Sequence, residues 1–360
     1  MKYVNKLFIK NREISIEAPT YFIADVASNH DGDVKRAKEL IKLAKEAGAD
    51  AVKFQHFLAK KIVSDYGFKN LKTGLDHQAK WDKSVFDVYK ECECDREWTE
   101  ELAEVAKECE IDFMTTPYDY EVLDMINDYI PAYKIGSGDI TWTDFISEIA
   151  KKNKPVILAS GASDFNDVDR AVEAILKYNN QIVLMQCNTN YTGSLENFKY
   201  VNLNVLKSFA VKYPNMILGL SDHTPGHSAV LGSVAFGARV VEKHFTDDNS
   251  KKGPDHMFSM NPTSWRAMID ATRELEYALG DGIKRIEKNE EQTSIVQRRC
   301  LRVKSDLKAS AIIKESDLEA LRPSPKGAIE PYNLKHLIGK KLLVAKTAGD
   351  AIYYEDIQEK

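Results

Sequence analysis

One local pattern occurs eight times between residues 21 and 279 of this chain. A short apolar run, rich in β-branched or aromatic residues, is followed by a polar turn and then by a segment with helical apolar spacing. We predict strands at residues 21–25, 51–55, 112–115, 132–136, 155–160, 182–187, 216–220 and 239–242. Eight strand–helix units in roughly 260 residues are typical of a (β/α)8 TIM barrel. A doubly wound open sheet is the rival, but it rarely needs eight such regular units, so the pattern favours the barrel.

The segments on either side of these units have other patterns. Residues 1–16 alternate polar and apolar side chains, which predicts a β-hairpin that turns at residues 10–12. A last barrel helix is predicted at residues 264–279, before the sequence Gly280-Asp281-Gly282. We therefore expect the hairpin and the barrel to form one domain, residues 1–283.

A smaller module is predicted after the barrel. Residues 284–297 are a charged linker, and the character of the chain changes at residue 298. The module, residues 298–360, contains predicted strands and helical turns at 301–303, 342–344, 315–318 and 333–337. At about 60 residues it is small for a self-sufficient core, so we expect it to pack on something larger.

Composition excludes several classes of function. The 360 residues carry a net charge of −5 with mixed signs and no basic patch, which argues against a nucleic-acid partner. No apolar run approaches the roughly 18 residues of a membrane span, and the N-terminus lacks a signal-peptide core. The five cysteines are scattered, as in proteins with reduced thiols. These features predict a cytoplasmic protein.

Two histidines occupy matching positions at the ends of the last two predicted strands. The sequence Ser221-Asp222-His223 follows the seventh strand, and Lys243-His244 follows the eighth, after Glu242. Residues at strand carboxyl ends converge on the ligand in a parallel α/β fold, and imidazoles there can bind a divalent metal. A lone histidine is more often a hydrogen-bonded loop residue. Two in matching positions, each beside a carboxylate, favour a metal site at His223 and His244.

Two lysines are predicted inside strands at the same end of the barrel. Strand alternation puts Lys53 and Gln55 on one face of the second strand, and Lys134 lies in the fourth. Buried amines are costly without an anionic partner, and the Ser–Gly turns nearby suit a phosphate or carboxylate. The alternatives are ion pairs with acids such as Asp25 or Glu242, and a Schiff-base lysine of depressed pKa. The residues favour an anion site and leave the Schiff base open.

Seven short motifs follow one another along the chain. They are NHDG after the first strand, AGADAVKFQ, PAYKIGSGD, GLSDHT, VEKHFT, GPDH with FSMNP, and the RP–G–I–P loop of the tail. With these motifs the chain resembles, over nearly its whole length, the sialic acid synthase family of nonulosonate synthases. The resemblance implies condensation of phosphoenolpyruvate with an N-acetylated, N-acetylmannosamine-like hexose. It also implies that the small module is an antifreeze-like (SAF) domain that reaches the partner's barrel in a domain-swapped homodimer.

The resemblance further implies roles for individual residues. His223 and His244 match the metal ligands, for which Mn²⁺ or Mg²⁺ is expected. The residues that match contacts to phosphoenolpyruvate are Lys53, Lys134, Ser137, Ser160 and Ser221. Those that match contacts to the amino sugar are Gln55, Tyr191, Asp255 and Arg322. We expect Asp25 and Glu242 to handle proton transfers and a cationic centre.

Three departures from the family pattern concern the substrates. Asp25 stands where the family usually has Glu, and the fifth strand ends Ala159-Ser160-Gly161 rather than Ser-Thr-Gly. The sixth strand continues as QCNTNY, and the loop between His56 and Ser84 matches no sugar contact. The acceptor sugar therefore stays open. Two other functions are consistent with the sequence: a Schiff-base aldolase on the same barrel and a non-catalytic carbohydrate-binding protein.

Overall fold

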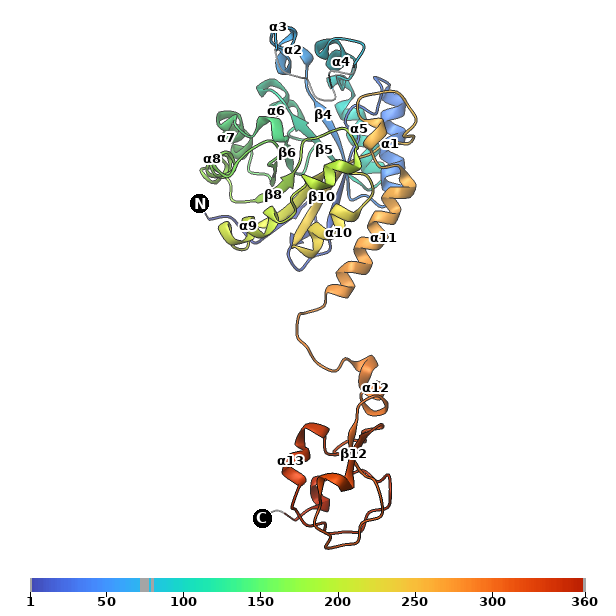
Figure 1. The fold of residues 1–360 in the computed structure, drawn as a ribbon. Helices are drawn as coiled ribbons and strands as arrows, with labels where there is room; N and C mark the ends of the chain where they lie inside the picture. Colours follow the sequence, from blue (N-terminus) through green and yellow to red (C-terminus); the bar gives the residue numbers. More distant parts are fainter. Residues whose placement is uncertain (1, 72–77, 79–80, 359–360) are drawn as a thin grey trace. The chain divides into compact units, whose positions relative to one another are not determined.

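The computed structural model describes residues 2–71, 78 and 81–358 (Figure 1). The chain forms two compact units, Met1–Gly280 and Asp281–Lys360. The helix α11 (Pro262–Leu279) ends one residue before this division.

The first unit is built around a sheet of eight strands. In sequence order these are β3 (Tyr21–Asp25), β4 (Ala51–His56), β5 (Asp112–Pro117), β6 (Tyr133–Ile135), β7 (Val156–Ala159), β8 (Ile182–Cys187), β9 (Ile217–Asp222) and β10 (Ala238–His244). Their spatial order is β5-β4-β3-β10-β9-β8-β7-β6, and the paired strands are parallel. The end strands β5 and β6 also lie next to each other. The predicted (β/α)8 barrel is confirmed.

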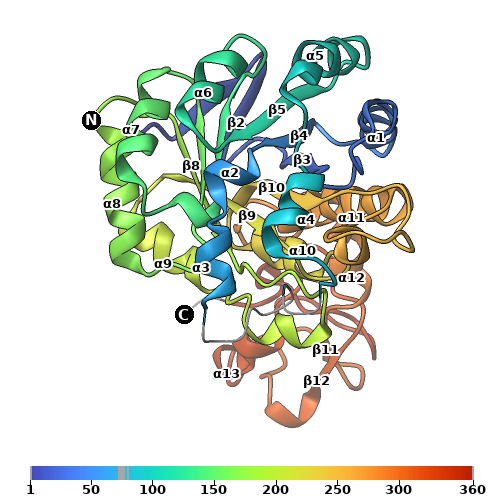
Figure 2. The same cartoon turned by 90° about the horizontal axis from the view of Figure 1, so that it is seen from above.

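Helices surround the strands, as the view along the barrel shows (Figure 2). Besides α11 they are α1 (Val34–Glu46), α5 (Thr99–Glu108), α6 (Tyr120–Ile126), α7 (Thr143–Lys151), α8 (Phe165–Leu176), α9 (Val205–Lys212) and α10 (Ser228–Ala235). Helix α1 is an example of why these segments form helices. Asp33 caps its first turn, and the residues buried at helical spacing are Ala37, Leu40, Ile41 and Ala44. Three further helices, α2 (Ala59–Ile62), α3 (Asp65–Lys69) and α4 (Val85–Glu91), belong to the insertion after β4.

The apolar core of the barrel unit has two parts. The larger part fills the space between the strands and the surrounding helices, and it includes Trp265 of α11. The smaller part lies inside the barrel and includes Ile23 and Met185. The hairpin of β1 (Lys6–Ile9) and β2 (Arg12–Ser15) adds apolar side chains to this inner cluster. The inside of the barrel is therefore packed with side chains, and polar chemistry is left to the strand carboxyl ends.

The last two barrel strands are longer than predicted. β9 runs to Asp222 and β10 to His244, because the parallel ladder continues and pairs Glu242 with Ser221 and Lys243 with Asp222. The predicted site residues of this region, except His223, therefore belong to the strands and not to the loops after them. Since they are fixed by a backbone ladder, their side chains alternate strictly between the two sides of the sheet.

The second unit has its own small apolar cluster. Its strands β11 (Cys300–Val303) and β12 (Leu318–Leu321) are antiparallel, and its helices are α12 (Glu291–Val296) and α13 (Leu334–Leu337). The strand predicted at 342–344 is wrong: Leu342 makes a single bridge to Ile357, and the next two side chains are exposed. The turn predicted at 315–318 is a 3-10 helix, Glu315–Asp317, that leads directly into β12.

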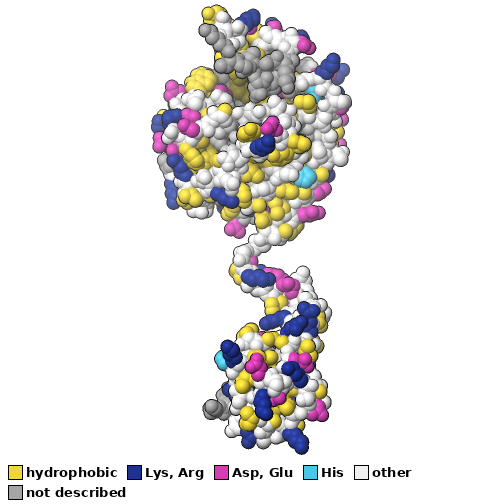
Figure 3. Space-filling view, in the orientation of Figure 1, with side chains coloured by type: hydrophobic (Ala, Val, Ile, Leu, Met, Phe, Trp, Pro, Cys, Tyr) yellow, Lys and Arg dark blue, Asp and Glu magenta, His cyan; other side chains and the backbone are white. Residues whose placement is uncertain are grey.

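The distribution of surface charge and the length of the helices are relevant to binding of nucleic acids and membranes. On the face of the barrel unit seen in Figure 3, cationic and anionic side chains are interspersed. Of the helices in the described part of the chain, none combines the length and apolar character needed to cross a bilayer.

Candidate active site

Charged side chains from three adjacent strands meet at the carboxyl end of the barrel. The ladder pairs Asp25 at the end of β3 with Lys53 of β4 on one side and with His244 of β10 on the other. Lys53 Nζ lies 2.7 Å from Asp25 Oδ2 and 3.9 Å from Glu242 Oε2. All these side chains are buried. Each charge is therefore stabilised mainly by its neighbours and not by water.

The pKa values of this pair are set by opposing effects. Burial acts to raise the pKa of Asp25, but the Lys53 and His244 charges and the hydrogen bonds from Lys53 and Gln55 hold it below its ordinary value. Burial acts to lower the pKa of Lys53, and the Asp25 and Glu242 carboxylates raise it above its ordinary value. Both groups are thus charged at neutral pH. A Schiff-base amine needs a depressed pKa, so Lys53 does not fit that role.

Glu242 bridges the second lysine to the same cluster. Its Oε1 lies 3.3 Å from Lys134 Nζ and accepts a hydrogen bond from Ser221 Oγ at 3.2 Å. Its Oε2 is buried and has no hydrogen-bond partner among the described residues. The lysines therefore form ion pairs with Asp25 and Glu242, which was the alternative to an anion site. An incoming anion would compete with these two carboxylates for the ammonium groups.

Near Lys134, the segments that follow β6 and β7 and the end of β8 lie close together. Ser137 is in the 3-10 helix Ser137–Asp139 after β6, and its Oγ accepts a hydrogen bond of 2.9 Å from Gly161 N. A Cβ atom on Gly161 would lie 2.9 Å from Ser137 Oγ and 3.0 Å from Cys187 Sγ. Only glycine allows this approach. The Cys187 thiol has a pKa below its ordinary value: burial acts to raise it, but hydrogen bonds to His223 and Ser137 outweigh this effect.

Ser160, whose contact with phosphate stays a prediction, makes a hydrogen bond within the barrel. Its Oγ donates to the Met185 carbonyl at 2.8 Å, and the residue lines a separate cavity of about 560 Å³ with Asn188. The side-chain hydroxyl thus completes the edge of the β7–β8 ladder.

The two histidines face each other with ring centroids 5.2 Å apart. His223 Nδ1 lies 2.9 Å from the Asn188 carbonyl, which can only accept, so Nδ1 carries the proton and Nε2 keeps its lone pair. His244 Nδ1 is buried and lacks a hydrogen-bond partner in the described chain. Its nearest anionic atoms are Asp25 Oδ2, 3.8 Å from Nε2, and Asp255 Oδ2, 3.9 Å from Nδ1.

Aromatic rings surround this histidine pair. The Tyr191 ring centroid lies 4.3 Å from that of His223 and 6.0 Å from that of His244, and Phe258 lies 5.0 Å from His244. These rings limit water around the imidazoles and lower the local dielectric.

A cavity of about 410 Å³ opens next to His244. Its polar lining includes Ser28, Gln55, Tyr191, Asp139 and Asp255. Burial raises the pKa of Asp139 to about 6. The cavity is also lined by apolar side chains from the segment after β4, which we call the insertion wall: Phe57, Ile62, Trp81, Val88 and Tyr89. Ring contacts hold the wall together, with 5.4 Å between the centroids of Phe57 and Tyr89.

No signal in the sequence indicated the insertion wall, and none marked Asp139, in the turn after the fourth strand, as a half-buried acid. The aromatic residues of the insertion were visible, but nothing in a single sequence indicated which of them turn towards the barrel. Part of the loop between His56 and Ser84, at residues 72–77 and 79–80, lies outside the described residues. Arg322 belongs to the second unit, where it follows β12 and is exposed.

Comparison with known proteins places this geometry in a family. The model of the NeuB family matches residues 40–284. An uncharacterized protein of Methanocaldococcus jannaschii is 34% identical over 98% of this chain and 99% of its own length. The N,N'-diacetyllegionaminic acid synthase of Campylobacter jejuni is 35% identical over 89% of this chain and 95% of its own.

A solved structure agrees with these sequence matches. The crystal structure of N-acetylneuraminic acid (sialic acid) synthetase from Leptospira borgpetersenii superposes with a TM-score of 0.69 and 26% identity, covering 81% of this chain and 96% of that one. The predicted resemblance to sialic acid synthases is confirmed: the chain belongs to the NeuB family of nonulosonic acid synthases.

Proposed function

We propose that this chain condenses phosphoenolpyruvate with an N-acylated aldose and water, giving a nonulosonic acid and phosphate. The observation that carries this proposal is the cluster of Lys53, Lys134, Glu242 and Asp25 beside the His223–His244 pair. Two buried cations suit a doubly charged phosphate, and two carboxylates suit proton transfer and a cationic centre.

The enol phosphate would bind to the lysines and the neighbouring hydroxyls. Lys53 and Lys134 would exchange part of their contact with Asp25 and Glu242 for phosphate and carboxylate oxygens, and Ser221 and Ser137 would add hydrogen bonds. Fixing the enol in one orientation turns a bimolecular carbon–carbon bond formation into a positioned one. Since both lysines are in barrel strands, this orientation is rigid.

The carboxylates would act after the new bond forms. Attack by the enol carbon on the aldehyde leaves a cationic centre at the carbon that bears the phosphate. Water adds to that carbon, and phosphate departs with its bridging oxygen. Glu242 Oε2, which lacks a hydrogen-bond partner in the described chain, suits stabilisation of the cation and removal of a proton from water. Asp25, held by Lys53 and Gln55, is the second group of this kind.

We further propose that His223 and His244 hold a divalent metal. The fit rests on two ring nitrogens: Nε2 of His223, whose partner atom Nδ1 is fixed by the Asn188 carbonyl, and the unpartnered Nδ1 of His244. No group of three or more ligating side chains occurs among the described residues, so substrate or water oxygens would complete the shell, as suits Mn²⁺ or Mg²⁺. Such an ion, when bound, supplies Lewis acidity to an aldehyde oxygen.

The cavity supports an acceptor that is polar on one side and apolar on the other. Gln55, Asp255 and Tyr191 offer hydrogen bonds to hydroxyl groups, whereas the insertion wall suits the methyl group of an acetamido or deoxy substituent. The two synthases named above carry different sugars in their names, so the acceptor of this chain has to be measured.

The test is a phosphate-release screen of phosphoenolpyruvate with a panel of aldoses. The panel contains N-acetylmannosamine, its 6-phosphate and diacetamido trideoxyhexoses, and product is identified by mass spectrometry. We expect phosphate and one nonulosonic acid in equal amounts from at least one aldose. Sugar binding by calorimetry without phosphate release from any of them would instead indicate a carbohydrate-binding protein.

A further inference from the structure

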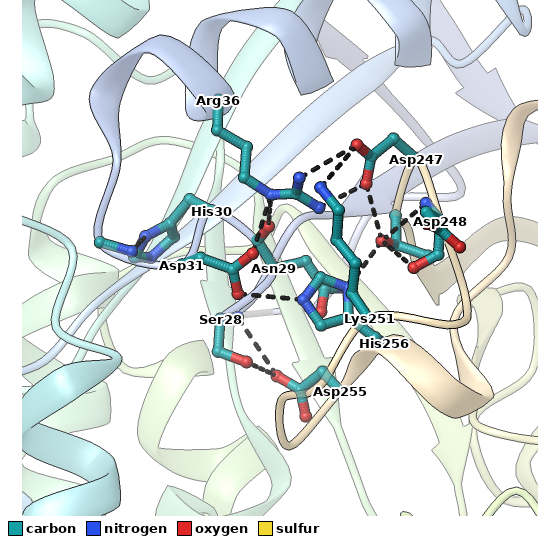
Figure 4. A network of polar contacts seen from close by, with 12 residues as sticks. Ser28, Asn29, His30, Asp31, Arg36, Asp247, Asp248, Lys251, Asp255 and His256 are labelled. Atoms are coloured by element: carbon teal, nitrogen blue, oxygen red, sulfur yellow. Dashed lines mark hydrogen bonds and ion pairs between the residues drawn. The ribbon is translucent and has the colours of Figure 1, made fainter.

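The loops after β3 and β10 are joined by a polar network, shown in Figure 4. Asn29 Nδ2 donates hydrogen bonds to Phe245 O and to Ser259 Oγ, both at 2.9 Å. The ring of His256 bridges from one loop to the other, with Nε2 3.0 Å from Asp31 Oδ1 and Nδ1 2.8 Å from Thr246 Oγ1. The two loops therefore act as one rigid rim of the barrel mouth.

Arg36 of α1 contacts both loops of the network. Its Nε donates to the Asn29 carbonyl at 2.6 Å and lies 3.1 Å from Asp31 Oδ2. Its Nη1 donates to Asp247 Oδ2 at 3.0 Å. Because a guanidinium offers donors in a fixed fork, this one side chain sets the distance between both loops.

The backbone of the rim is held in costly conformations. Ala27 and Asp31 have φ of +47° and +53°, in the left-handed region that non-glycine residues avoid. A Cβ atom on Gly253 would lie 2.7 Å from His256 Cδ2, so glycine is needed for His256 to reach Asp31. Such conformations persist only where surrounding contacts over-determine them, and they are typical of functional sites.

The network ends at one carboxylate that lines the cavity. Asp255 Oδ2 accepts two hydrogen bonds from Ser28, one from N at 3.2 Å and one from Oγ at 2.6 Å. The Asp255 carbonyl accepts from Ser259 Oγ at 2.6 Å, which fixes its backbone. Within the described chain, no donor reaches Asp255 Oδ1. One oxygen is thus held in place, and the other is left for a ligand.

We propose that Ser28 is a positioning residue for the acceptor. It locks the rotamer of Asp255, so that Oδ1 faces the cavity and accepts a hydrogen bond from a sugar hydroxyl. This inference rests on the proposed function, because the ligand of Asp255 is taken to be the acceptor aldose. Ser28 lines the same cavity as Asp255, but its hydroxyl proton is used by the Asp255 carboxylate, so Ser28 acts through that carboxylate.

Kinetics of Ser28→Ala test this role. Loss of one hydrogen bond to a charged oxygen should raise KM for the acceptor about tenfold, while kcat and KM for phosphoenolpyruvate change less than threefold. Ser28→Thr keeps the hydroxyl and should restore most of the affinity. Ser147→Ala on α7, which removes the hydroxyl donor to the Thr143 carbonyl away from the site, is the matched control and should leave all constants unchanged.

A double-mutant cycle and a structure complete the test. If Ser28 acts through Asp255, Ser28→Ala should have no further effect in the Asp255→Asn background. Crystals of Ser28→Ala should show the Asp255 carboxylate rotated, a result that does not depend on which reaction the protein performs. An unmoved carboxylate would overturn the positioning role even if the enzyme is active. Absence of turnover by the unaltered protein, with the carboxylate rotated in the variant, would overturn only the proposed function.

Discussion

Lys53 and Asp25 form an ion pair of 2.7 Å at the carboxyl end of the barrel, and only 2% of each side chain is exposed. The pair joins adjacent strands β4 and β3, and Glu242 Oε2 of β10 lies 3.9 Å from the Lys53 amine. Because each charge is compensated by its neighbours, the phosphate site proposed for these lysines would be stable inside the barrel before substrate binds.

Removing one partner of this pair should destabilise the barrel. Asp25→Asn leaves Lys53 with only the distant Glu242 carboxylate, and we expect the free energy of unfolding to fall by about 3 kcal/mol. Lys53→Met in the same chain should recover much of this loss, because no uncompensated charge remains. Urea unfolding followed by tryptophan fluorescence reports on the barrel unit, since all four tryptophans lie there. A double variant as unstable as Asp25→Asn alone would contradict this account.

Metal binding should depend on both strand-end histidines. His223→Ala and His244→Ala should each abolish calorimetric binding of Mn²⁺ and lower turnover at least a hundredfold, with far-UV dichroism unchanged. His227→Ala, a nearby histidine outside the site, is the control. A chelator should have the same effect on the unaltered protein, and added Mn²⁺ should reverse it. Full activity after chelation would contradict the metal role, and borohydride trapping would then test for a lysine adduct.

The stability of the fold should fall in mild acid because of His30. Burial lowers the pKa of this histidine to about 4, whereas an unfolded histidine titrates near 6.5. Between these pH values the unfolded chain binds a proton that the native chain does not. The free energy of unfolding therefore decreases as pH falls from about 6.5 to 4, by about 3 kcal/mol for this group.

The measurement compares unfolding at pH 7 and pH 4.5 in matched variants. His30→Gln should show a smaller loss than the unaltered protein, by roughly 2 kcal/mol or more. His336→Gln, which replaces an exposed histidine of the second unit, should lose as much as the unaltered protein. Equal losses in all three proteins would show that His30 is not the group concerned.

The insertion wall should set affinity for the acceptor alone. Tyr89 lies in the wall and contacts Phe57, so Tyr89→Ala should raise KM for the acceptor tenfold or more, with KM for phosphoenolpyruvate unchanged. Tyr66→Ala is the matched control, because Tyr66 is in the same insertion but 79% exposed. A parallel rise in both KM values would indicate a general disturbance of the barrel mouth instead.

The barrel could be predicted because its signal is local. Strands β3 and β8 have the predicted bounds, and the other barrel strands differ by one or two residues at an end, since short apolar runs and turns determine each unit separately. The same strand pattern placed Lys53, Lys134 and Glu242 towards the carboxyl ends of their strands, and the structure brings these side chains together. The stated role of Arg322 in a partner's barrel stays a prediction.

What the sequence could not indicate depends on contacts between distant segments. Asp222 lies between Ser221 and His223 in the sequence, but its side chain forms an ion pair of 2.5 Å with Lys243. Ser28 and Asp255 are 227 residues apart, and only the folded loops bring them within a hydrogen bond. The Ser160 hydroxyl donates to the Met185 carbonyl, a contact across two strands that the sequence did not indicate.

In the proposed reaction the enol phosphate reacts at carbon, and its carbon–oxygen bond is broken. Phosphoenolpyruvate labelled with ¹⁸O in the bridging position, supplied with the acceptor found in the screen, tests it most directly. Because water adds to the carbon that bears the phosphate, the bridging oxygen should leave with phosphorus, and mass spectrometry should find one ¹⁸O in the released phosphate. Unlabelled phosphate, with the label kept in the organic product, would mean cleavage at phosphorus and would contradict the account.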